Sequence, residues 1–129
     1  MKGSALTIVN NTNGKQIRLP FALMKQAVLG KRYVLDVILV TPQESRRLNS
    51  LYRKKNKPAN VLSFSLSKTE GQIVLCPRQA RLEAKAYDRT PAKFMRFLFI
   101  HGLLHLKGYR HGSRMEAEEK RLDAAFLRP

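Results

Sequence analysis

The chain has 129 residues, of which 43% are hydrophobic and 26% are charged. This length suits a single domain spanning residues 1–129, and the composition excludes a disordered or low-complexity protein. The 25 Lys and Arg residues outnumber the 9 Asp and Glu residues, which gives a formal net charge of +16 and a pI near 10.7. Such a charge predicts a polyanionic partner, and its spread along the chain favours nucleic acid over a membrane surface.

The N-terminal residues and the cysteine content indicate the compartment. Residues 1–4 (MKGS) lead into a strand-like segment and lack the apolar stretch of a secretory signal. Cys76 is the one cysteine of the chain, so it cannot form an internal disulfide and is expected to be a buried thiol. We therefore expect a cytoplasmic protein that does not span a membrane.

The N-terminal part of the chain predicts two strands, each followed by a helix. The predicted strands cover residues 5–9 and 33–40, because both segments are mostly apolar and rich in β-branched side chains. A helix is expected over residues 20–30 from the helical spacing of its apolar residues. A second helix begins at a capping box over residues 41–44. Its inward-facing residues are expected to be Leu48, Leu51 and Tyr52.

The middle of the chain predicts a basic loop, a β-hairpin and a helix. Residues 53–60 form the loop, and residues 62–66 alternate in the period of a half-buried strand. A turn at residues 70–71 is expected to pair this strand with a second one over residues 72–75. The polar face of the first strand consists of Ser63 and Ser65. The helix, over residues 77–87, is expected to turn Ala80, Ala84 and Tyr87 inward.

The strongest chemical signal lies on a helix predicted over residues 91–107. Its apolar segment is too short for a membrane span, so it is expected to be a buried core helix. His101 and His105 are four residues apart and therefore lie on the same helical face. Gly108 allows the chain to turn, which brings His111 back toward them. All 3 histidines of the protein thus fall within one short segment, a pattern that predicts a metal site.

Three neutral imidazoles leave a fourth tetrahedral position open for water, which is typical of catalytic rather than structural zinc. We expect one Zn²⁺ per chain. A structural zinc would need a fourth protein ligand. The same histidine spacing occurs in zinc peptidases, where a glutamate follows the first histidine and acts as general base. Gly102 stands at that position here, which makes a peptidase the weaker alternative.

The C-terminal segment predicts a last helix that starts at a capping box over residues 113–116. Its inward residues are expected to be Met115, Leu122 and Phe126. Glu116, Glu118 and Glu119 are expected to be exposed and paired with Lys120 and Arg121, with a catalytic carboxylate among them as the less favoured alternative. The sequence therefore predicts an α+β domain in which a sheet of about four strands packs with about five helices.

Several segments resemble one known family. Residues 101–111 (HGLLHLKGYRH) resemble the signature of the YbeY family of rRNA maturation factors. Residues 60–65 (NVLSFS) resemble its second motif, Arg53 matches the lead-in to that motif, and residues 71–75 (GQIVL) resemble the strand that follows. The resemblance covers about residues 48–126.

This resemblance implies a metal-dependent endoribonuclease that cleaves single-stranded RNA. It further implies a role in 16S rRNA maturation and ribosome quality control, with rRNA and the small ribosomal subunit as partners. The sheet would be mixed, and the metal would lie at the end of the central buried helix. The family's zinc ligands correspond to His101, His105 and His111, and its phosphate-binding arginine corresponds to Arg53.

One position departs from the family pattern. Arg110 stands where the family usually has an aspartate, directly before the third histidine. A cation there either removes a carboxylate that would orient the metal ligands or adds a contact to phosphate. Ser63 and Ser65 are either substrate contacts or small residues on a half-exposed strand. A ribosome-associated RNA-binding protein with a structural metal therefore stays open beside the endoribonuclease.

Overall fold

The computed structural model describes residues 5–15 and 17–126; residues 1–4, on which the absence of a secretory signal was predicted, lie outside this part. Its elements in chain order are β1 (Leu6–Asn10), α1 (Phe21–Leu29), β2 (Val34–Leu39), α2 (Pro42–Arg53), β3 (Val61–Ser67), β4 (Glu70–Leu75), α3 (Pro77–Ala84), the 3₁₀ helix η1 (Lys85–Tyr87), α4 (Pro91–Lys107) and α5 (Ser113–Ala125). The predicted α+β class with one mixed sheet is confirmed.

The four strands form one sheet in the order β1-β2-β4-β3. β1, β2 and β4 run parallel, and β3 pairs with β4 in the antiparallel direction, so the predicted hairpin is confirmed. The turn predicted at residues 70–71 is wrong, because β4 already begins at Glu70. An irregularity between Ser65 and Ser67 shifts the register so that Ser67 pairs with Glu70, which moves the turn to residues 68–69.

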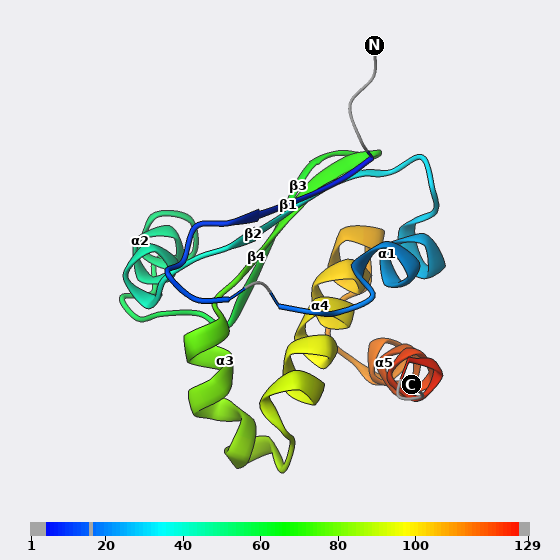
Figure 1. Cartoon of the computed structure of the whole chain (residues 1–129). Helices are drawn as coiled ribbons and strands as arrows, with labels where there is room; N and C mark the ends of the chain where they lie inside the picture. Colours follow the sequence, from blue (N-terminus) through cyan, green and yellow to red (C-terminus); the bar gives the residue numbers. More distant parts are fainter. Residues whose placement is uncertain (1–4, 16, 127–129) are drawn as a thin grey trace.

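The main core lies between the sheet and α4. Figure 1 shows α1, α4 and α5 together on one side of the sheet. α4 begins where the Thr90 side chain accepts a hydrogen bond from the Lys93 backbone N–H, with Pro91 at the first helical position. The buried residues of α4 are Phe94, Met95, Leu98, Phe99, Ile100, Gly102, Leu103 and Leu104. α4 is therefore the central buried helix that the sequence predicts.

The face of α2 that points inward is partly polar. Ser45 and Asn49 are buried, and their side chains donate hydrogen bonds to the carbonyl oxygens of Ala59 (2.6 Å) and Lys57 (2.9 Å). The prediction that Leu51 and Tyr52 pack inward is wrong, since they are 61% and 57% exposed. Helix α2 uses its inner face to hold the basic loop in place, and this leaves those two side chains outside.

The predicted end of α3 and the predicted start of α5 need smaller corrections. α3 ends at Ala84 and continues as η1, so Tyr87 is exposed rather than inward, although one face of its ring stacks on Phe94. The capping box predicted at Ser113 does not form. The N-cap of α5 is Gly112, whose carbonyl accepts the Glu116 N–H at 3.0 Å, so Ser113 already lies inside the first turn.

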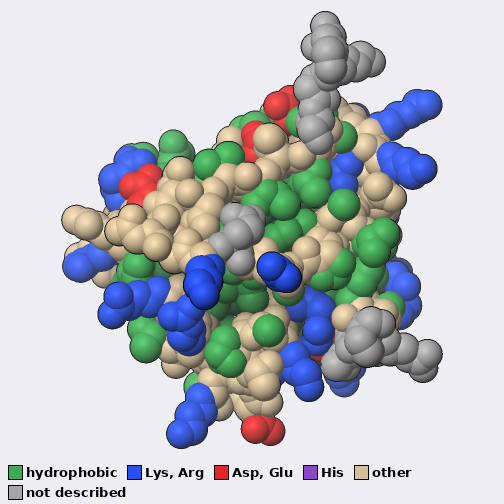
Figure 2. All heavy atoms as spheres, viewed as in Figure 1, with side chains coloured by type: hydrophobic (Ala, Val, Ile, Leu, Met, Phe, Trp, Pro, Cys, Tyr) green, Lys and Arg blue, Asp and Glu red, His purple; other side chains and the backbone are tan. Residues whose placement is uncertain are grey.

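Basic side chains outnumber acidic ones on the face shown in Figure 2. Figure 2 shows Lys and Arg side chains scattered over the face in view, with few carboxylates between them. Among residues 5–15 and 17–126, no helix is both long and apolar enough to cross a bilayer.

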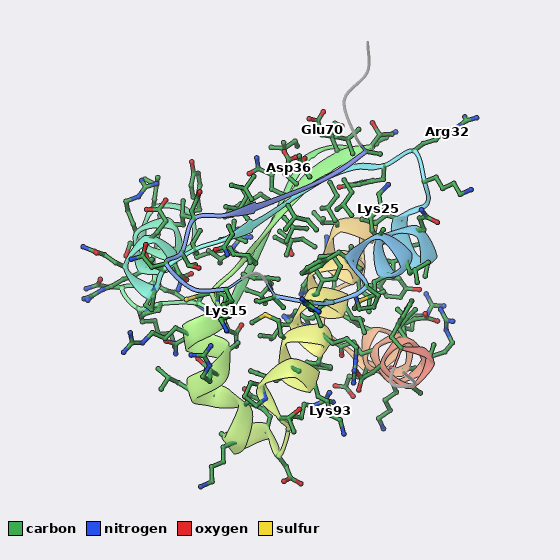
Figure 3. The ribbon with its side chains drawn as sticks, viewed as in Figure 1. Lys15, Lys25, Arg32, Asp36, Glu70 and Lys93 are labelled. Carbon is green, nitrogen blue, oxygen red and sulfur yellow. The ribbon has the colours of Figure 1, made fainter. Side chains whose placement is uncertain are left out.

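Two lysines fix the end of α1. Lys25 is only 2% exposed, and its Nζ donates a hydrogen bond to the Lys31 carbonyl at 2.8 Å, just beyond the helix end (Figure 3). Burial lowers the pKa of the Lys25 ammonium from its ordinary value. The Nζ of Lys107, at the end of α4, donates to the Val28 carbonyl at 2.9 Å. The Lys107 bond attaches the C-terminal end of α4 to α1.

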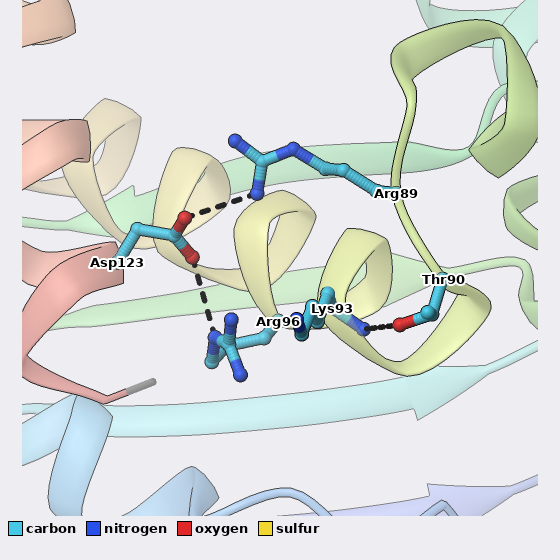
Figure 4. Close-up of polar contacts among 5 residues, drawn as sticks. All are labelled: Arg89, Thr90, Lys93, Arg96 and Asp123. Atoms are coloured by element: carbon cyan, nitrogen blue, oxygen red, sulfur yellow. Dashed lines mark hydrogen bonds and ion pairs between the residues drawn. The ribbon is translucent and has the colours of Figure 1, made fainter. Parts of the chain in front are cut away.

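A carboxylate joins α5 to the start of α4. Asp123 accepts hydrogen bonds from Arg89 at 3.0 Å and from Arg96 at 3.2 Å, one on each carboxylate oxygen (Figure 4). The side chains of Asp123 and Arg96 are 14% and 11% exposed. This contact fixes α5 against the helix that carries two of the histidines.

Candidate metal centre

His101, His105 and His111 converge at the C-terminal end of α4. One nitrogen from each imidazole can be chosen so that all three atoms lie within 4.8 Å of one another. The Nε2 atoms of His101 and His105 are 3.0 Å apart. The structure therefore brings together all three histidines of the predicted site in a group that could hold a metal ion.

The turn after α4 returns the chain toward the helix face. Gly108 has φ +109°, a left-handed conformation that a side chain would disfavour. Its N–H donates to the carbonyl of His105, and the Tyr109 N–H donates to that of Leu104. This tight helix end brings the exposed His111 back beside the two half-buried histidines of α4.

Hydrogen bonds at the Nδ1 atoms orient two of the rings. Nδ1 of His101 lies 2.6 Å from a carboxylate oxygen of Glu119, and Nδ1 of His105 lies 3.1 Å from the carbonyl oxygen of Tyr109. Both partners are acceptors, so each Nδ1 carries the proton and the neutral rings present the lone pairs of Nε2. Two such lone pairs only 3.0 Å apart fit a shared cation. The donor set and its tautomers therefore suit a metal.

Glu119 is where the structure most clearly corrects the sequence analysis. We expected an exposed side chain paired with lysine or arginine, but Glu119 is 8% exposed and contacts His101. The sequence does carry a signal for this: Met115, Glu119 and Leu122 follow helical spacing, and all three are buried on one face of α5. Glu118, by contrast, pairs with Arg121 on the surface as predicted.

The protonation of His105 also favours metal binding. Its burial lowers the pKa of the imidazole, and the nearby His101 lowers it further. The hydrogen bond to the Tyr109 backbone acts in the opposite direction but is a smaller influence. The protein therefore favours the neutral ring, which is the form that binds a metal.

Gly102 packs against the sheet. A Cβ at this position would lie 3.0 Å from Oγ of Ser63 and 3.2 Å from Cδ1 of Ile73. A larger side chain would therefore force Ser63 and Ile73 to shift, and the chain lacks the glutamate that acts as general base in the peptidases. This packing weighs against the peptidase alternative.

The histidines open onto a groove of about 1020 Å³. Its lining includes His101, His105, His111, Arg53, Ser63, Ser65, Lys55, Lys57, Asn60, Gln79, Glu83, Tyr87, Phe94 and Phe97. The structure thus brings the predicted arginine, both serines and the histidines to one surface, which we call the histidine groove.

Arg53 is held at the wall of the histidine groove. Although we expected it in a loop, it is the last residue of α2. Its Nη2 donates to the Ser63 carbonyl at 2.9 Å, and its guanidinium lies 5.3 Å from the ring centre of Phe64. These contacts fix its position while using only one of its five N–H donors in that hydrogen bond.

The remaining predicted residues differ in their contacts. The Ser63 hydroxyl donates to the Gly102 carbonyl at 3.2 Å, and the Ser65 hydroxyl donates to the Ser67 carbonyl at 3.3 Å. Arg110 is exposed and is not among the residues that line the histidine groove. Cys76 is a buried thiol, as predicted, and is not part of the histidine cluster.

Comparison with known proteins gives one family and relatives that carry the name of that family. The family model described as endoribonuclease YbeY matches residues 6–125. The endoribonuclease YbeY of Francisella philomiragia is 38% identical over 96 residues, which cover 66% of this chain and 61% of that protein. The one from Buchnera aphidicola is 36% identical over 118 residues, or 82% of this chain and 76% of that protein. The chain aligns with 61% and 63% of the length of the Francisella and Neisseria meningitidis relatives, so it spans less than two thirds of either.

The match extends to a solved structure. The solution structure of a Thermotoga maritima protein matches with a TM-score of 0.68 and 26% identity, and the match covers 95% of this chain and 89% of the other. By its sequence and its fold, the chain belongs to the endoribonuclease YbeY family.

Proposed function

We propose that this protein is a zinc-dependent endoribonuclease that cleaves single-stranded RNA, with His101, His105 and His111 as the metal ligands. The observation that carries the proposal is the position of the histidines. All three line a groove that also contains Arg53, which is held by a hydrogen bond to the Ser63 carbonyl, and an arginine suits the phosphate of a substrate. The relatives named endoribonuclease YbeY support RNA as that substrate.

The groove residues provide the remaining parts of a phosphodiester-cleaving site. When bound, zinc would act as a Lewis acid that polarises a phosphoryl oxygen. Arg53 would bind the same phosphate through its remaining guanidinium donors and stabilise the negative charge that develops on it. Lys55 and Lys57 also line the groove and would hold the neighbouring phosphates by charge.

Three further residues are proposed to contact the substrate. The O–H groups of Ser63 and Ser65 donate to backbone carbonyls, and their oxygens would accept a hydrogen bond from a ribose hydroxyl. Arg110 is exposed directly beside His111, and we assign it a phosphate contact outside the groove. Its charge would then extend the path of the RNA backbone past the metal.

We further infer that the enzyme works in the cytoplasm in 16S rRNA maturation and ribosome quality control, with the small ribosomal subunit as its partner. The resemblance of residues 101–111 to the family signature supports this role, and so does the net charge of +16.

The test measures zinc content and cleavage of a labelled single-stranded RNA on the same preparations. We expect stoichiometric zinc and cleavage in the wild type, loss of both in His105→Ala, and loss of cleavage alone in Arg53→Ala. A wild type that binds zinc and RNA without cutting would contradict the proposal. That result would instead favour a ribosome-associated RNA-binding protein with a structural metal.

A further inference from the structure

Four rings follow one another along the histidine groove toward the metal centre. Tyr87 stacks on Phe94, with ring centres 4.9 Å apart and planes inclined by 18°. Phe94 and Phe97 are nearly parallel, 11° apart in orientation and 6.5 Å between centres. Phe97 lies 6.3 Å from His101. All four rings line the groove, so the series forms a continuous aromatic path that ends at a candidate metal ligand.

Among the three carbocyclic rings of this path, Tyr87 is the one that offers a free face. Phe94 is only 1% exposed. Phe97 is covered by the Arg89 guanidinium, which lies 4.4 Å from its ring centre. Tyr87 is 59% exposed, and within the described part of the chain Phe94 is its sole ring partner. Its outer face can therefore extend the stack by one more planar group.

The histidine groove contains positively charged residues that suit phosphates and a carboxylate that suits bases. Arg53, Lys55 and Lys57 supply positive charge to the lining. The same lining contains Glu83, whose carboxylate oxygens accept hydrogen bonds from the amide groups of Asn60 (2.8 Å) and Gln79 (2.5 Å). A carboxylate repels phosphate but suits the amino groups at the edge of a nucleobase. Glu83 and Tyr87 both belong to the segment that runs from α3 into η1.

We propose that Tyr87 is a stacking platform for a nucleobase of the RNA substrate. The backbone of the strand lies along Arg53, Lys55 and Lys57, and a base some nucleotides away from the cleaved bond stacks on the outer face of Tyr87. The ligand is single-stranded, because bases in a duplex are already stacked and do not present a free face. This inference rests on the proposed function for the identity of its ligand.

The experiment measures binding separately from cleavage, in the full chain carrying His105→Gln. The probe is a short labelled RNA with one 2-aminopurine, whose fluorescence is quenched by stacking. We expect Tyr87→Ala to weaken binding about tenfold or more and to abolish the quenching, and Tyr87→Phe to retain both. Leu82→Ala is the matched control, because Leu82 is 69% exposed on α3 and does not line the groove. Circular dichroism melts show whether each variant is folded.

The outcomes separate the platform from the proposed function. Equal binding by the His105→Gln protein with and without Tyr87→Ala would overturn the platform. So would a loss of affinity in Tyr87→Ala that is the same for an RNA with no base at the stacked position. If the protein with all three histidines cuts RNA while Tyr87→Ala leaves binding unchanged, the proposed function stands and the platform fails. If Tyr87 quenches 2-aminopurine and the protein with all three histidines does not cut RNA, the platform stands and the proposed function fails.

Discussion

Glu119 reaches the metal centre from a different helix than the histidine it contacts. A carboxylate on the second nitrogen of a metal-binding imidazole fixes the tautomer and the ring orientation and makes the ligand more basic. The 2.6 Å bond between Glu119 and Nδ1 of His101 has this arrangement. Glu119 therefore acts on the histidine cluster rather than on the groove surface.

We expect Glu119→Ala to weaken zinc binding about 10- to 100-fold, and Glu119→Gln to weaken it less because the amide oxygen still accepts the hydrogen bond. Competition against a chromogenic chelator measures the affinity. Glu118→Ala is the control, since Glu118 pairs with Arg121 at the surface. Equal zinc affinity in all variants would remove Glu119 from the metal centre.

The Cys76 thiol is expected to be unreactive in the folded protein. It is 1% exposed, and burial raises the pKa of its thiol above the ordinary value of 9.0. Because the unfolded chain loses this proton first, the thiol's contribution to stability is complete below pH 9 and decreases as the pH rises toward the folded pKa.

Iodoacetamide should therefore label Cys76 only when the protein unfolds, and Cys76→Ala should lose less stability than wild type between neutral and alkaline pH. Mass spectrometry of labelled samples and denaturant titrations measure the two effects. Rapid labelling of the native protein at neutral pH would show that the thiol is accessible.

At the scale of elements, Asp123 on α5 pairs with Arg96 on α4 and with Arg89 just before it, and these ion pairs hold the two helices together. Replacing it with Asn keeps the shape but leaves the nearly buried Arg96 without its counter-charge. We expect Asp123→Asn to lower the free energy of unfolding by about 1–3 kcal/mol, less than for a fully buried pair because Arg89 is partly exposed. Urea denaturation measures the change. Glu118→Gln removes an exposed pair and should shift the midpoint much less; equal shifts would refute the distinction.

The cluster of three histidines was predictable because their spacing lies within one helix and one turn, where local geometry is fixed. The hairpin and the capped start of α2 were predictable for the same reason. Glu119 was missed because its partner is 18 positions away and its neighbours are acidic and basic, a pattern typical of a solvated helix face.

The inner face of α2 was missed for a related reason. Hydrophobic periodicity favours Leu51 and Tyr52 as core residues, but Ser45 and Asn49 hold the backbone of the basic loop by hydrogen bonds. Such a tertiary contact outweighs the local apolar pattern and leaves no trace in it.

For the whole molecule, the net charge of +16 predicts strong salt dependence of RNA binding. Each phosphate contact contributes about 0.7 to the slope of log affinity against log salt concentration for a single strand. Replacing Lys55 and Lys57 with Gln should reduce this slope by about 1.4 in fluorescence anisotropy titrations. The double variant Lys15→Gln and Lys68→Gln changes exposed charges that do not line the histidine groove. It should change the slope less; equal effects would mean that the groove does not direct the RNA backbone.

The order of the site residues along the chain has a consequence during translation. Arg53, Lys55 and Lys57 are made well before the histidines, and Glu119 follows the last histidine. A nascent chain that emerges N-terminus first therefore exposes these three basic residues before it can assemble the histidine cluster. The oriented metal centre is not complete until residue 119 has left the exit tunnel. In this order of synthesis, the proposed nuclease gains the residue that orients His101 only after all three of its histidines have been made.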